Sequence, residues 1–252
     1  MSRILVFGGT CEGRELVSWL AGRGVSVIAY SATEYGESLL PESSRVLSFA
    51  KRLDAEQMVQ VMRQEAFSCV VDATHPYAVE VSANIKAAAS ELGLEVMRLV
   101  REDVPEGPWT SVASTDEAAR LIARRKGNVL LTTGSKDLAA YVQAVPDYKQ
   151  RLYVRILPVA SSLEQADKLG IPASRIIAMQ GPFSAELNKA LIESLEIETL
   201  VTKAAGKAGG FPEKVQAARE TGCELLVIDR PVENNQGISL DEAKCLLAQR
   251  FC

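Results

Sequence analysis

The sequence has few aromatic residues and no long apolar run. Aromatic side chains make up 6% of the 252 residues, too few for a platform on which nucleic-acid bases stack. The formal net charge of −4 at pH 7 argues against polyanion binding as the main function but allows a local basic pocket. No stretch reaches the roughly 18 consecutive apolar residues needed to cross a bilayer, and no secretory signal pattern is present. We therefore expect neither a nucleic-acid partner nor membrane association.

Cysteine usage excludes two further classes. The five cysteines are odd in number, and no two of them have the C-x-x-C spacing. Neither a disulfide framework nor a zinc site is indicated, and no metal is expected. A reducing, cytoplasmic location fits this pattern best.

What the chain does contain is an alternation of short apolar runs and longer helical patterns. Most of the runs are nearly continuous in apolar character, as strands covered on both faces of a parallel sheet are. The predicted strands are 3–7, 25–30, 69–73, 95–99, 128–131, 152–156, 175–179, 199–202 and 224–229. The predicted helices include 11–23, 55–65, 78–92, 115–124 and 138–145. This βαβ alternation predicts an α/β fold.

A proline- and glycine-bearing segment at 102–109 interrupts the periodic patterns. We interpret it as a crossover between two halves of the chain. The expected division is an N-terminal dinucleotide-binding domain over residues 1–105 and a C-terminal Rossmann-like domain over residues 106–252. One continuous domain is the alternative.

A glycine-rich turn directly follows the first predicted strand. Gly8 and Gly13 have the spacing of the outer glycines of a dinucleotide fingerprint, and Gly9 lies between them. Such a turn presents backbone amides and a helix N-terminus to phosphate. Thr10 replaces the middle glycine and offers a hydroxyl to a phosphate oxygen, with Glu12 in the same turn. On this interpretation a bulky residue at Gly13 weakens nucleotide binding and leaves folding largely intact; a tight turn that needs small residues for packing is the alternative.

The end of the second predicted strand bears on the choice of nucleotide. NAD enzymes tend to place an acid there against the ribose diol, but this chain has the small hydroxyl residues Ser31 and Thr33. These tolerate a 2′-phosphate and so favour NADPH. No arginine is close in the sequence, and NADH stays open.

Four polar side chains follow the strand predicted at 69–73. They are Asp72, Thr74, His75 and Tyr77, and His75 is the only histidine of the chain. Ligands of open parallel sheets bind at this edge, and Pro76 keeps His75 out of helical geometry. Alternatively, Asp72 and Thr74 cap the following helix while His75 packs under a loop.

Two turns in the second half resemble anion-binding nests. One contains Gly134, Ser135 and Lys136 after the strand predicted at 128–131, and the other contains Gly181 after the strand at 175–179. Each signal is weak alone, because any turn between a strand and a helix can have this composition.

A loop rich in lysine and glycine follows the strand predicted at 199–202. It contains Lys203, Lys207, Gly209 and Gly210, and Lys214 follows at a helix start. The glycines permit close approach of a ligand, and the lysines provide positive charge. A flexible, exposed basic loop is the alternative.

Five sequence blocks occur in order along nearly the full chain: ILVFGGTCEGREL, DATHPYA, LLTTGSKDL, MQGPFS and TKAAGKAGGFPEK. Together they resemble the precorrin-6A reductase family, including its cobalt-precorrin-6A counterpart. The resemblance implies an oxidoreductase of cobalamin biosynthesis that uses NADPH or NADH to reduce one double bond of an anionic tetrapyrrole, giving precorrin-6B. Cys11 departs from the small polar residue that many relatives have there.

The resemblance also implies two Rossmann-like parallel-sheet halves with a cleft between them. The implied reaction gives expected roles to the motif residues. The nucleotide would contact Gly8, Gly9, Thr10, Glu12, Gly13, Ser31, Thr33 and Thr74. The carboxylates of the macrocycle would meet Arg101, Gly134, Ser135, Lys136, Gly181, Lys203, Lys207, Gly209, Gly210 and Lys214. Asp72, His75 and Tyr77 are the acids that compete with bulk water to supply the proton.

Two other classes share part of this pattern. A non-catalytic dinucleotide-binding sensor would have the glycine turn without turnover. A methyltransferase that binds S-adenosylmethionine also has such a turn, but it usually has an acid at the end of the second strand. Both leave the lysine- and glycine-rich loop unexplained. The oligomeric state and the presence of cobalt in the ring stay open.

Overall fold

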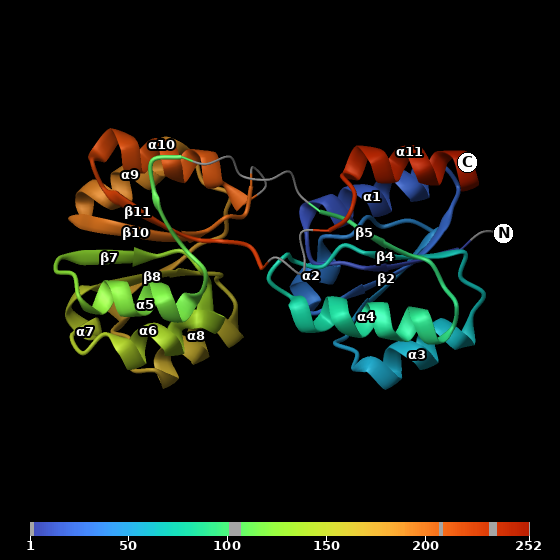
Figure 1. Cartoon of the computed structure of the whole chain (residues 1–252), viewed down its shortest axis with the longest axis horizontal. Helices are drawn as coiled ribbons and strands as arrows, with labels where there is room; N and C mark the ends of the chain where they lie inside the picture. The colour runs from blue at the N-terminus through green and yellow to red at the C-terminus, as the bar shows by residue number, and fades with distance from the viewer. Residues whose placement is uncertain (1–2, 101–106, 207–208, 232–235, 252) are drawn as a thin grey trace. The chain divides into compact units, whose positions relative to one another are not determined.

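The computed structural model describes residues 3–100, 107–206, 209–231 and 236–251. The chain divides into two compact units, coloured along the chain in Figure 1. The first comprises Met1–Glu102 together with Pro231–Cys252, and the second comprises Asp103–Arg230. Each unit is built on a parallel sheet with helices between its strands, which confirms the predicted α/β class.

The sheet of the first unit has the strand order β3-β2-β1-β4-β5. This is the order of the first five strands of a dinucleotide-binding Rossmann sheet. The strands are β1 (Arg3–Phe7), β2 (Ser26–Ser31), β3 (Val46–Ala50), β4 (Cys69–Asp72) and β5 (Val96–Arg98). The helices are α1 (Cys11–Gly22), α2 (Glu34–Ser38), α3 (Ala55–Gln64), α4 (Val79–Glu91) and α11 (Leu240–Phe251). Helices α1 and α11 cover one face of the sheet, and α3 and α4 cover the other (Figure 1).

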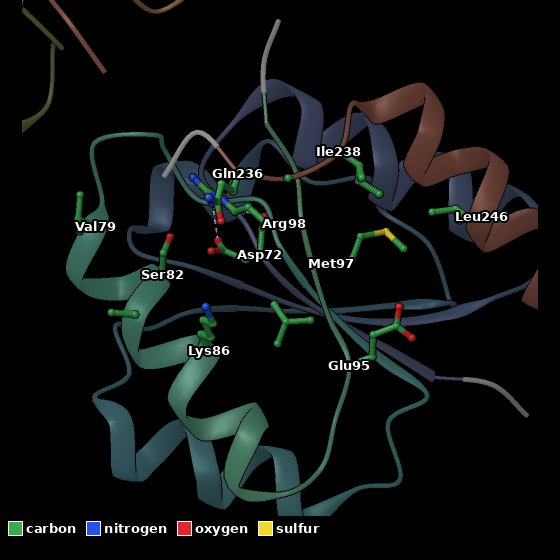
Figure 2. Close-up of a pocket in the computed structure, with 13 residues that line it drawn as sticks. Asp72, Val79, Ser82, Lys86, Glu95, Met97, Arg98, Gln236, Ile238 and Leu246 are labelled. Atoms are coloured by element: carbon green, nitrogen blue, oxygen red, sulfur yellow. Dashed lines mark hydrogen bonds and ion pairs between the residues drawn. The ribbon is translucent and has the colours of Figure 1, made fainter. Parts of the chain in front are cut away.

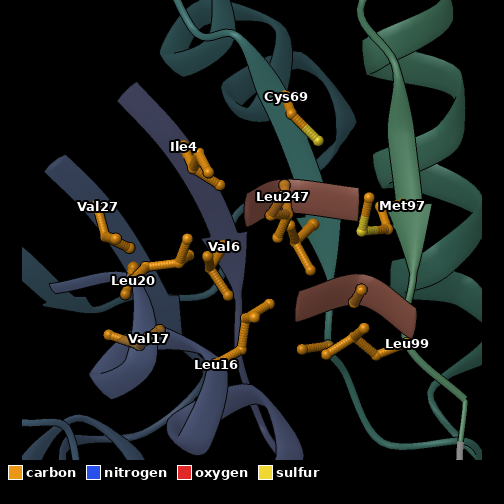
Figure 3. Packing of buried hydrophobic residues seen from close by; sticks show 14 of the residues in the cluster. Ile4, Val6, Leu16, Val17, Leu20, Val27, Cys69, Met97, Leu99 and Leu247 are labelled. Atoms are coloured by element: carbon orange, nitrogen blue, oxygen red, sulfur yellow. The ribbon is translucent and has the colours of Figure 1, made fainter. Parts of the chain in front are cut away.

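One core of the first unit lies between the sheet and helices α1 and α11. Ile4 and Val6 of β1 meet Leu16 and Leu20 of α1, and Leu247 of α11 closes the same cluster (Figure 3). All five side chains are fully buried. Because apolar burial is the dominant favourable term in folding, this cluster holds α1, and with it the glycine turn, against the sheet.

The sheet of the second unit has the order β6-β11-β10-β7-β8-β9. Read from β9, the order of β7 to β11 repeats that of the first unit, and β6 is added beyond β11. The strands are β6 (Thr110–Val112), β7 (Asn128–Leu131), β8 (Leu152–Ile156), β9 (Ile176–Ala178), β10 (Ile197–Lys203) and β11 (Glu224–Ile228). The helices are α5 (Thr115–Ala123), η1 (Ser135–Asp137), α6 (Leu138–Ala144), α7 (Tyr148–Arg151), α8 (Ala160–Lys168), η2 (Ala173–Arg175), α9 (Ala185–Ser194) and α10 (Phe211–Thr221).

Every predicted strand is present, and β1, β7 and β8 have the predicted bounds. The sequence analysis missed β3 and β6, both of which lie at a sheet edge. Edge strands are only partly buried, so they lack the continuous apolar run of a central strand. In β3, Leu47 is 52% exposed and Phe49 is 37% exposed.

The expected boundary of the C-terminal domain is wrong, because the last part of the chain belongs to the first unit. Ile238 forms an isolated parallel bridge with Leu99 at the end of β5, and the buried face of α11 completes the core beside α1. The apolar pattern of α11 indicates that the helix has a buried face, but it does not indicate which sheet that face covers.

Gly13 has a packing role that the binding interpretation did not anticipate. A Cβ atom at this position would lie 2.8 Å from the Cβ of Ala73, closer than two side-chain carbons approach without displacement. The missing side chain therefore lets α1 sit directly on the end of β4, as the last glycine of a dinucleotide fingerprint does. The expectation that a larger residue at Gly13 leaves folding largely intact is wrong on this geometry.

We expect Gly13→Ala to lower the free energy of unfolding by about 1–3 kcal/mol, because α1 must shift away from the sheet. Gly22→Ala, in the same helix, is the matched control, since nothing lies within 4 Å of its Cβ position. Urea denaturation of the two variants measures the difference. Equal effects would show that the contact with Ala73 is unimportant.

Candidate functional site

The turn after β1 leaves its backbone uncovered. A Cβ atom at Gly8 would lie 3.6 Å from the carbonyl oxygen of Tyr30, and one at Gly9 would lie 3.6 Å from the amide nitrogen of His75. Both are ordinary contact distances, and neither glycine has the left-handed conformation. The first unit itself would therefore tolerate side chains here, so their absence suits close approach of a ligand.

Thr10 joins this turn to β4. Its hydroxyl donates to the carbonyl oxygen of Ala73 at 3.1 Å and accepts a hydrogen bond from the amide of Gly13, also at 3.1 Å. Thr10 is 6% exposed. Its hydroxyl hydrogen is therefore used within the protein, and the expectation that it bonds a phosphate oxygen is wrong. Glu12 accepts a hydrogen bond from the thiol of Cys11 at 3.2 Å.

The turn after β4 is organised by Asp72 and by an arginine that the sequence analysis did not select. One carboxylate oxygen of Asp72 accepts hydrogen bonds from the amide of Thr74 at 3.0 Å, from its hydroxyl at 2.7 Å and from Nη1 of Arg98 at 2.7 Å. The same Nη1 contacts the carbonyl oxygen of Thr74 at 3.1 Å, and the Thr74 hydroxyl lies 3.2 Å from that of Ser82.

Asp72 is 2% exposed, and the oxygen described above is committed to three donors. These contacts give it a structural role in shaping the turn in place of the predicted role as proton donor. Neither Asp72 nor Thr74 caps the next helix, because α4 begins after Ala78 and has no side-chain cap. The sequence predicted that Asp72 donates a proton or caps a helix. In the structure it instead forms an ion pair with Arg98 that shapes the turn (Figure 2).

His75 and Tyr77 lie beside the glycine turn. Nδ1 of His75 accepts a hydrogen bond from the amide of Tyr77 at 3.4 Å, and the two rings are 5.5 Å apart. Both residues are half-buried. The backbone contact between Gly9 and His75 places the ends of β1 and β4 next to each other, as the strand order requires.

Two basic residues that directly follow β3 lie near the end of β2. Ser31 is buried, and its carbonyl oxygen accepts a hydrogen bond from the amide of Lys51 at 2.9 Å. Lys51 and the next residue, Arg52, are exposed. The hydroxyl of Thr33 caps α2 through the amide of Gly36. No arginine is close to Ser31 in the sequence. In the fold, however, the chain that leaves β3 brings Lys51 next to Ser31, and Arg52 follows Lys51.

The corresponding turn of the second unit follows β7. Gly134 has a φ of 90°, the Ser135 hydroxyl donates to that of Ser162 at 3.3 Å, and Lys136 is exposed. Lys203, at the end of β10, forms an ion pair with Asp137 at 2.6 Å. Lys203 therefore connects the end of β10 to the turn after β7. The prediction gave Lys203 a contact with the substrate and did not include this structural role.

A buried cationic cluster lies between β8 and α10. Arg155 donates to the side-chain oxygen of Asn188 at 2.8 Å, and its guanidinium lies 4.3 Å from the ring centre of Phe183. Nζ of Lys214 donates to the carbonyl oxygen of Gly209 at 2.7 Å. Burial lowers the pKa of Arg155 to about 10, and burial together with the charge of Arg155 lowers the pKa of Lys214 to about 8.

The predicted glycines of this region have internal reasons to lack side chains. A Cβ at Gly181 would lie 3.0 Å from the ring of Phe183, and one at Gly209 would overlap the side chain of Ala205. Gly210 adopts the left-handed conformation at the start of α10, which disfavours other residues. These glycines alone therefore do not indicate a ligand. The predicted substrate residues Arg101 and Lys207 lie outside the described residues.

The sequence analysis missed Arg98, Arg155, Lys51 and Arg52. Arg98 and Arg155 each lie within a strand, where a charged residue is rarely buried without a partner. An arginine inside an apolar run is therefore a usable signal. Lys51 and Arg52 could be found only by recognising β3.

Two classes of feature are absent from the ranges that the structure describes. Within them, no group of three or more His, Cys, Asp or Glu side chains is placed to hold a metal ion. No helix in the same ranges has the length and apolar character to cross a membrane.

The strand order defines the first unit as a Rossmann-type α/β unit with an open glycine turn, joined in one chain to a second α/β unit with a buried cationic cluster. Comparison with known proteins narrows this class. Residues 3–248 match the family described as precorrin-6x reductase CbiJ/CobK. The chain belongs to this family, whose members are oxidoreductases of cobalamin biosynthesis that act on a CH–CH bond.

Individual relatives agree with the family. The chain is 36% identical over 252 residues to the cobalt-precorrin-6A reductase of Salmonella typhimurium, covering 98% of this chain and 95% of the relative. It is 34% identical over 231 residues to the cobalt-precorrin-6A reductase of Priestia megaterium, covering 90% of each. A solved structure of CobK precorrin-6A reductase superposes with a TM-score of 0.79 at 28% identity, covering 99% of this chain and 97% of that one.

The buried Lys214 predicts a specific pH dependence of stability. Its folded-state pKa is about 8, whereas lysine in an unfolded chain titrates near about 10.4. Between these values the unfolded state binds more protons, so stability rises with pH. We expect the free energy of unfolding to gain up to about 1.4 kcal/mol per pH unit from pH 8 to 10 relative to Lys214→Met. Denaturant titrations across this window measure the gain, with the more exposed Lys189→Met as control; parallel curves for all three proteins would contradict it.

Proposed function

We propose that this protein transfers a hydride from NADPH to one double bond of precorrin-6A or its cobalt-containing form, giving the corresponding precorrin-6B. The observation that carries the proposal is the match along nearly the whole chain to one reductase family, combined with the open glycine turn at the end of β1. When bound, the nicotinamide supplies the hydride. The chain has to bind both molecules, orient them and provide for the proton.

The first unit has the features needed to bind NADPH. The amide of Gly9 and the N-terminus of α1 suit a pyrophosphate, whereas the amide of Gly8 donates to the carbonyl oxygen of Tyr30 at 2.7 Å. A carboxylate repels phosphate, so Glu12 in this turn is suited to a ribose hydroxyl. Lys51 and Arg52 lie beside Ser31, where a 2′-phosphate would accept charge-assisted hydrogen bonds. This basic pair is the feature that favours NADPH over NADH.

The second unit has the features needed to bind a polycarboxylate. In the described part of the chain, neither Arg155 nor Lys214 forms an ion pair with a carboxylate. Both donate to neutral oxygens, and the charge of Glu213 only partly offsets the effect of burial on the pKa of Lys214. The two buried cations are therefore unfavourable until an anion compensates their charge. A propionate or acetate group of the macrocycle supplies such an anion. The exposed Lys136 adds positive charge to the same unit.

The proton goes to the carbon next to the one that receives the hydride. His75 and Tyr77 are the protein acids proposed for this step, because the backbone of His75 lies next to Gly9 of the turn that would hold the nucleotide, and the ring of Tyr77 lies 5.5 Å from that of His75. Bulk water is the competing donor. Asp72 and Arg98 keep the turn in place and do not take part in the transfer.

The basic pair gives the first test of the nucleotide. We expect Lys51→Ser with Arg52→Ser to raise the Kd of NADPH by about tenfold or more, because charge-assisted hydrogen bonds to the 2′-phosphate are lost. The Kd of NADH should change little. Fluorescence titration measures both, with Arg63→Ser on α3 as control. Equal losses for the two nucleotides would show that the pair does not contact the 2′-phosphate.

The buried cationic cluster gives the test of the substrate. We expect Arg155→Gln to raise the KM for precorrin-6A by about tenfold and to reduce the dependence of KM on salt, because one ion pair is removed. NADPH affinity should be unchanged, and the exposed Arg120→Gln is the control. An unaltered KM removes Arg155 from the site. Binding of NADPH by the wild-type protein without any turnover of precorrin-6A would identify a nucleotide sensor.

A further inference from the structure

The second unit exposes large apolar side chains at one end of its sheet. In the described ranges these are Leu157, Leu163 and Met179, which are 41%, 40% and 37% exposed; we call them the apolar edge. Leu157 directly follows β8 and Met179 directly follows β9, while Leu163 lies in the first turn of α8, the helix that comes after β8. The apolar edge therefore lies at the carboxyl ends of the strands, where open parallel sheets bind ligands.

Two members of the apolar edge adjoin each other across the β8–β9 pair. The register of these strands ends with Ile156 opposite Ala178. Leu157 and Met179 are the next residues in that register, and the amide of Met179 donates to the carbonyl oxygen of Ile156 at 3.0 Å. Side chains two residues apart along a strand point to the same face, and Leu157 follows Arg155 by two residues. Leu157 and Met179 therefore lie on the face of the sheet that carries Arg155.

A ring contact also keeps Arg155 close to the apolar edge. The chain that leaves Met179 reaches Phe183 four residues later, and the ring centre of Phe183 lies 4.3 Å from the guanidinium of Arg155. Among the described residues, the side chain of Arg155 donates to the neutral oxygen of Asn188 and pairs with no carboxylate. A cation that lacks an anionic partner thus borders the exposed apolar side chains.

The two strands next to β8 carry basic residues at the same edge. Lys203 is the last residue of β10, and the exposed Lys136 lies in the turn after β7. In the strand order β10-β7-β8-β9, the carboxyl edge therefore changes from basic over β10 and β7 to apolar over β8 and β9. Because neighbouring strands are about 4.8 Å apart, the basic and apolar parts lie within about 15 Å of each other.

This arrangement restricts the molecule that fits the edge. A small polar anion would leave the apolar edge uncovered, and a neutral apolar molecule would provide no anion for Arg155 and Lys136. A macrocycle with largely apolar faces and carboxylates on its rim contacts both parts at once. Ligand sites commonly have this composition, with an apolar lining and a few polar groups that fix the orientation.

We propose that the apolar edge binds one face of the tetrapyrrole substrate, with Leu157 and Met179 in contact with the ring while its carboxylates meet Arg155 and Lys136. The inference rests on the proposed function, because that function supplies the macrocycle. Burial of apolar surface contributes binding free energy in proportion to its area. Salt screens the ionic contacts but not this apolar contact, so the two contributions can be measured separately.

The test uses the full chain with Leu157→Ser and Met179→Ser combined. We expect the KM for precorrin-6A to rise about tenfold, because apolar contact area is lost. The dependence of KM on salt should stay that of the wild type, in contrast to Arg155→Gln, and the Kd of NADPH should be unchanged. Leu157→Met combined with Met179→Leu preserves the apolar area and should keep the wild-type KM. Leu47→Ser, which removes a leucine that is 52% exposed in the first unit, is the control.

Each contrary outcome has a distinct meaning. If the wild type turns over precorrin-6A and the double serine variant keeps its KM, the inference is overturned and the proposed function stands. An unchanged KM with a smaller mass in light scattering would identify the apolar edge as a contact between copies of the chain. An equal rise in KM for the serine and the conservative variants would show a general disturbance and also overturn the inference. If the wild type does not turn over precorrin-6A, the proposed function fails and the inference fails with it.

Discussion

Contact between α1 and the end of β4 at Ala73 is the constraint on which the first unit depends. The carbonyl of Ala73 accepts the Thr10 hydroxyl, and its side chain occupies the space left by Gly13. These contacts hold the N-terminus of α1 beside the paired ends of β1 and β4, from which the chain continues to β2 on one side of the sheet and to β5 on the other. Gly9 and His75 are neighbours as a result. A binding turn and two candidate proton donors thus follow from one close approach of helix to sheet.

Each unit has an arginine on a strand that is largely covered by the rest of the unit. Arg98 on β5 and Arg155 on β8 each lie next to a central strand of their own sheet. Arg98 is half-buried and its charge is compensated by Asp72, whereas Arg155 is buried and donates to the neutral side chain of Asn188. A buried charge that is not fully compensated is unfavourable for folding alone. The proposed contact with a carboxylate of the substrate therefore rests on Arg155 and not on Arg98.

The repeated strand order shows how the C-terminal segment completes the first unit. Both sheets contain five strands in the 3-2-1-4-5 order, where the numbers give the order of the strands along the chain. In both sheets a further segment of the chain lies beside the fifth strand. In the second unit this is β6, which comes before the first strand of the repeat. In the first unit it is the segment around Ile238, which the chain reaches only after completing the second unit. The first unit is thus built from two segments of the chain that flank the second unit in the sequence.

The sequence by itself determined the central strands, the helices between them, the glycine turn and the family. Strands such as β1, β7 and β8 are buried on both faces and are therefore continuous apolar runs, which can be recognised without knowing their neighbours. Tertiary structure alone decided which residues meet. It placed Lys51 beside Ser31 through an edge strand that has no clear pattern, paired Arg98 with Asp72, paired Lys203 with Asp137, and brought α11 to the first unit. Periodicity records which face of an element is buried, but the partner of that face depends on strand order, which only the folded chain reveals.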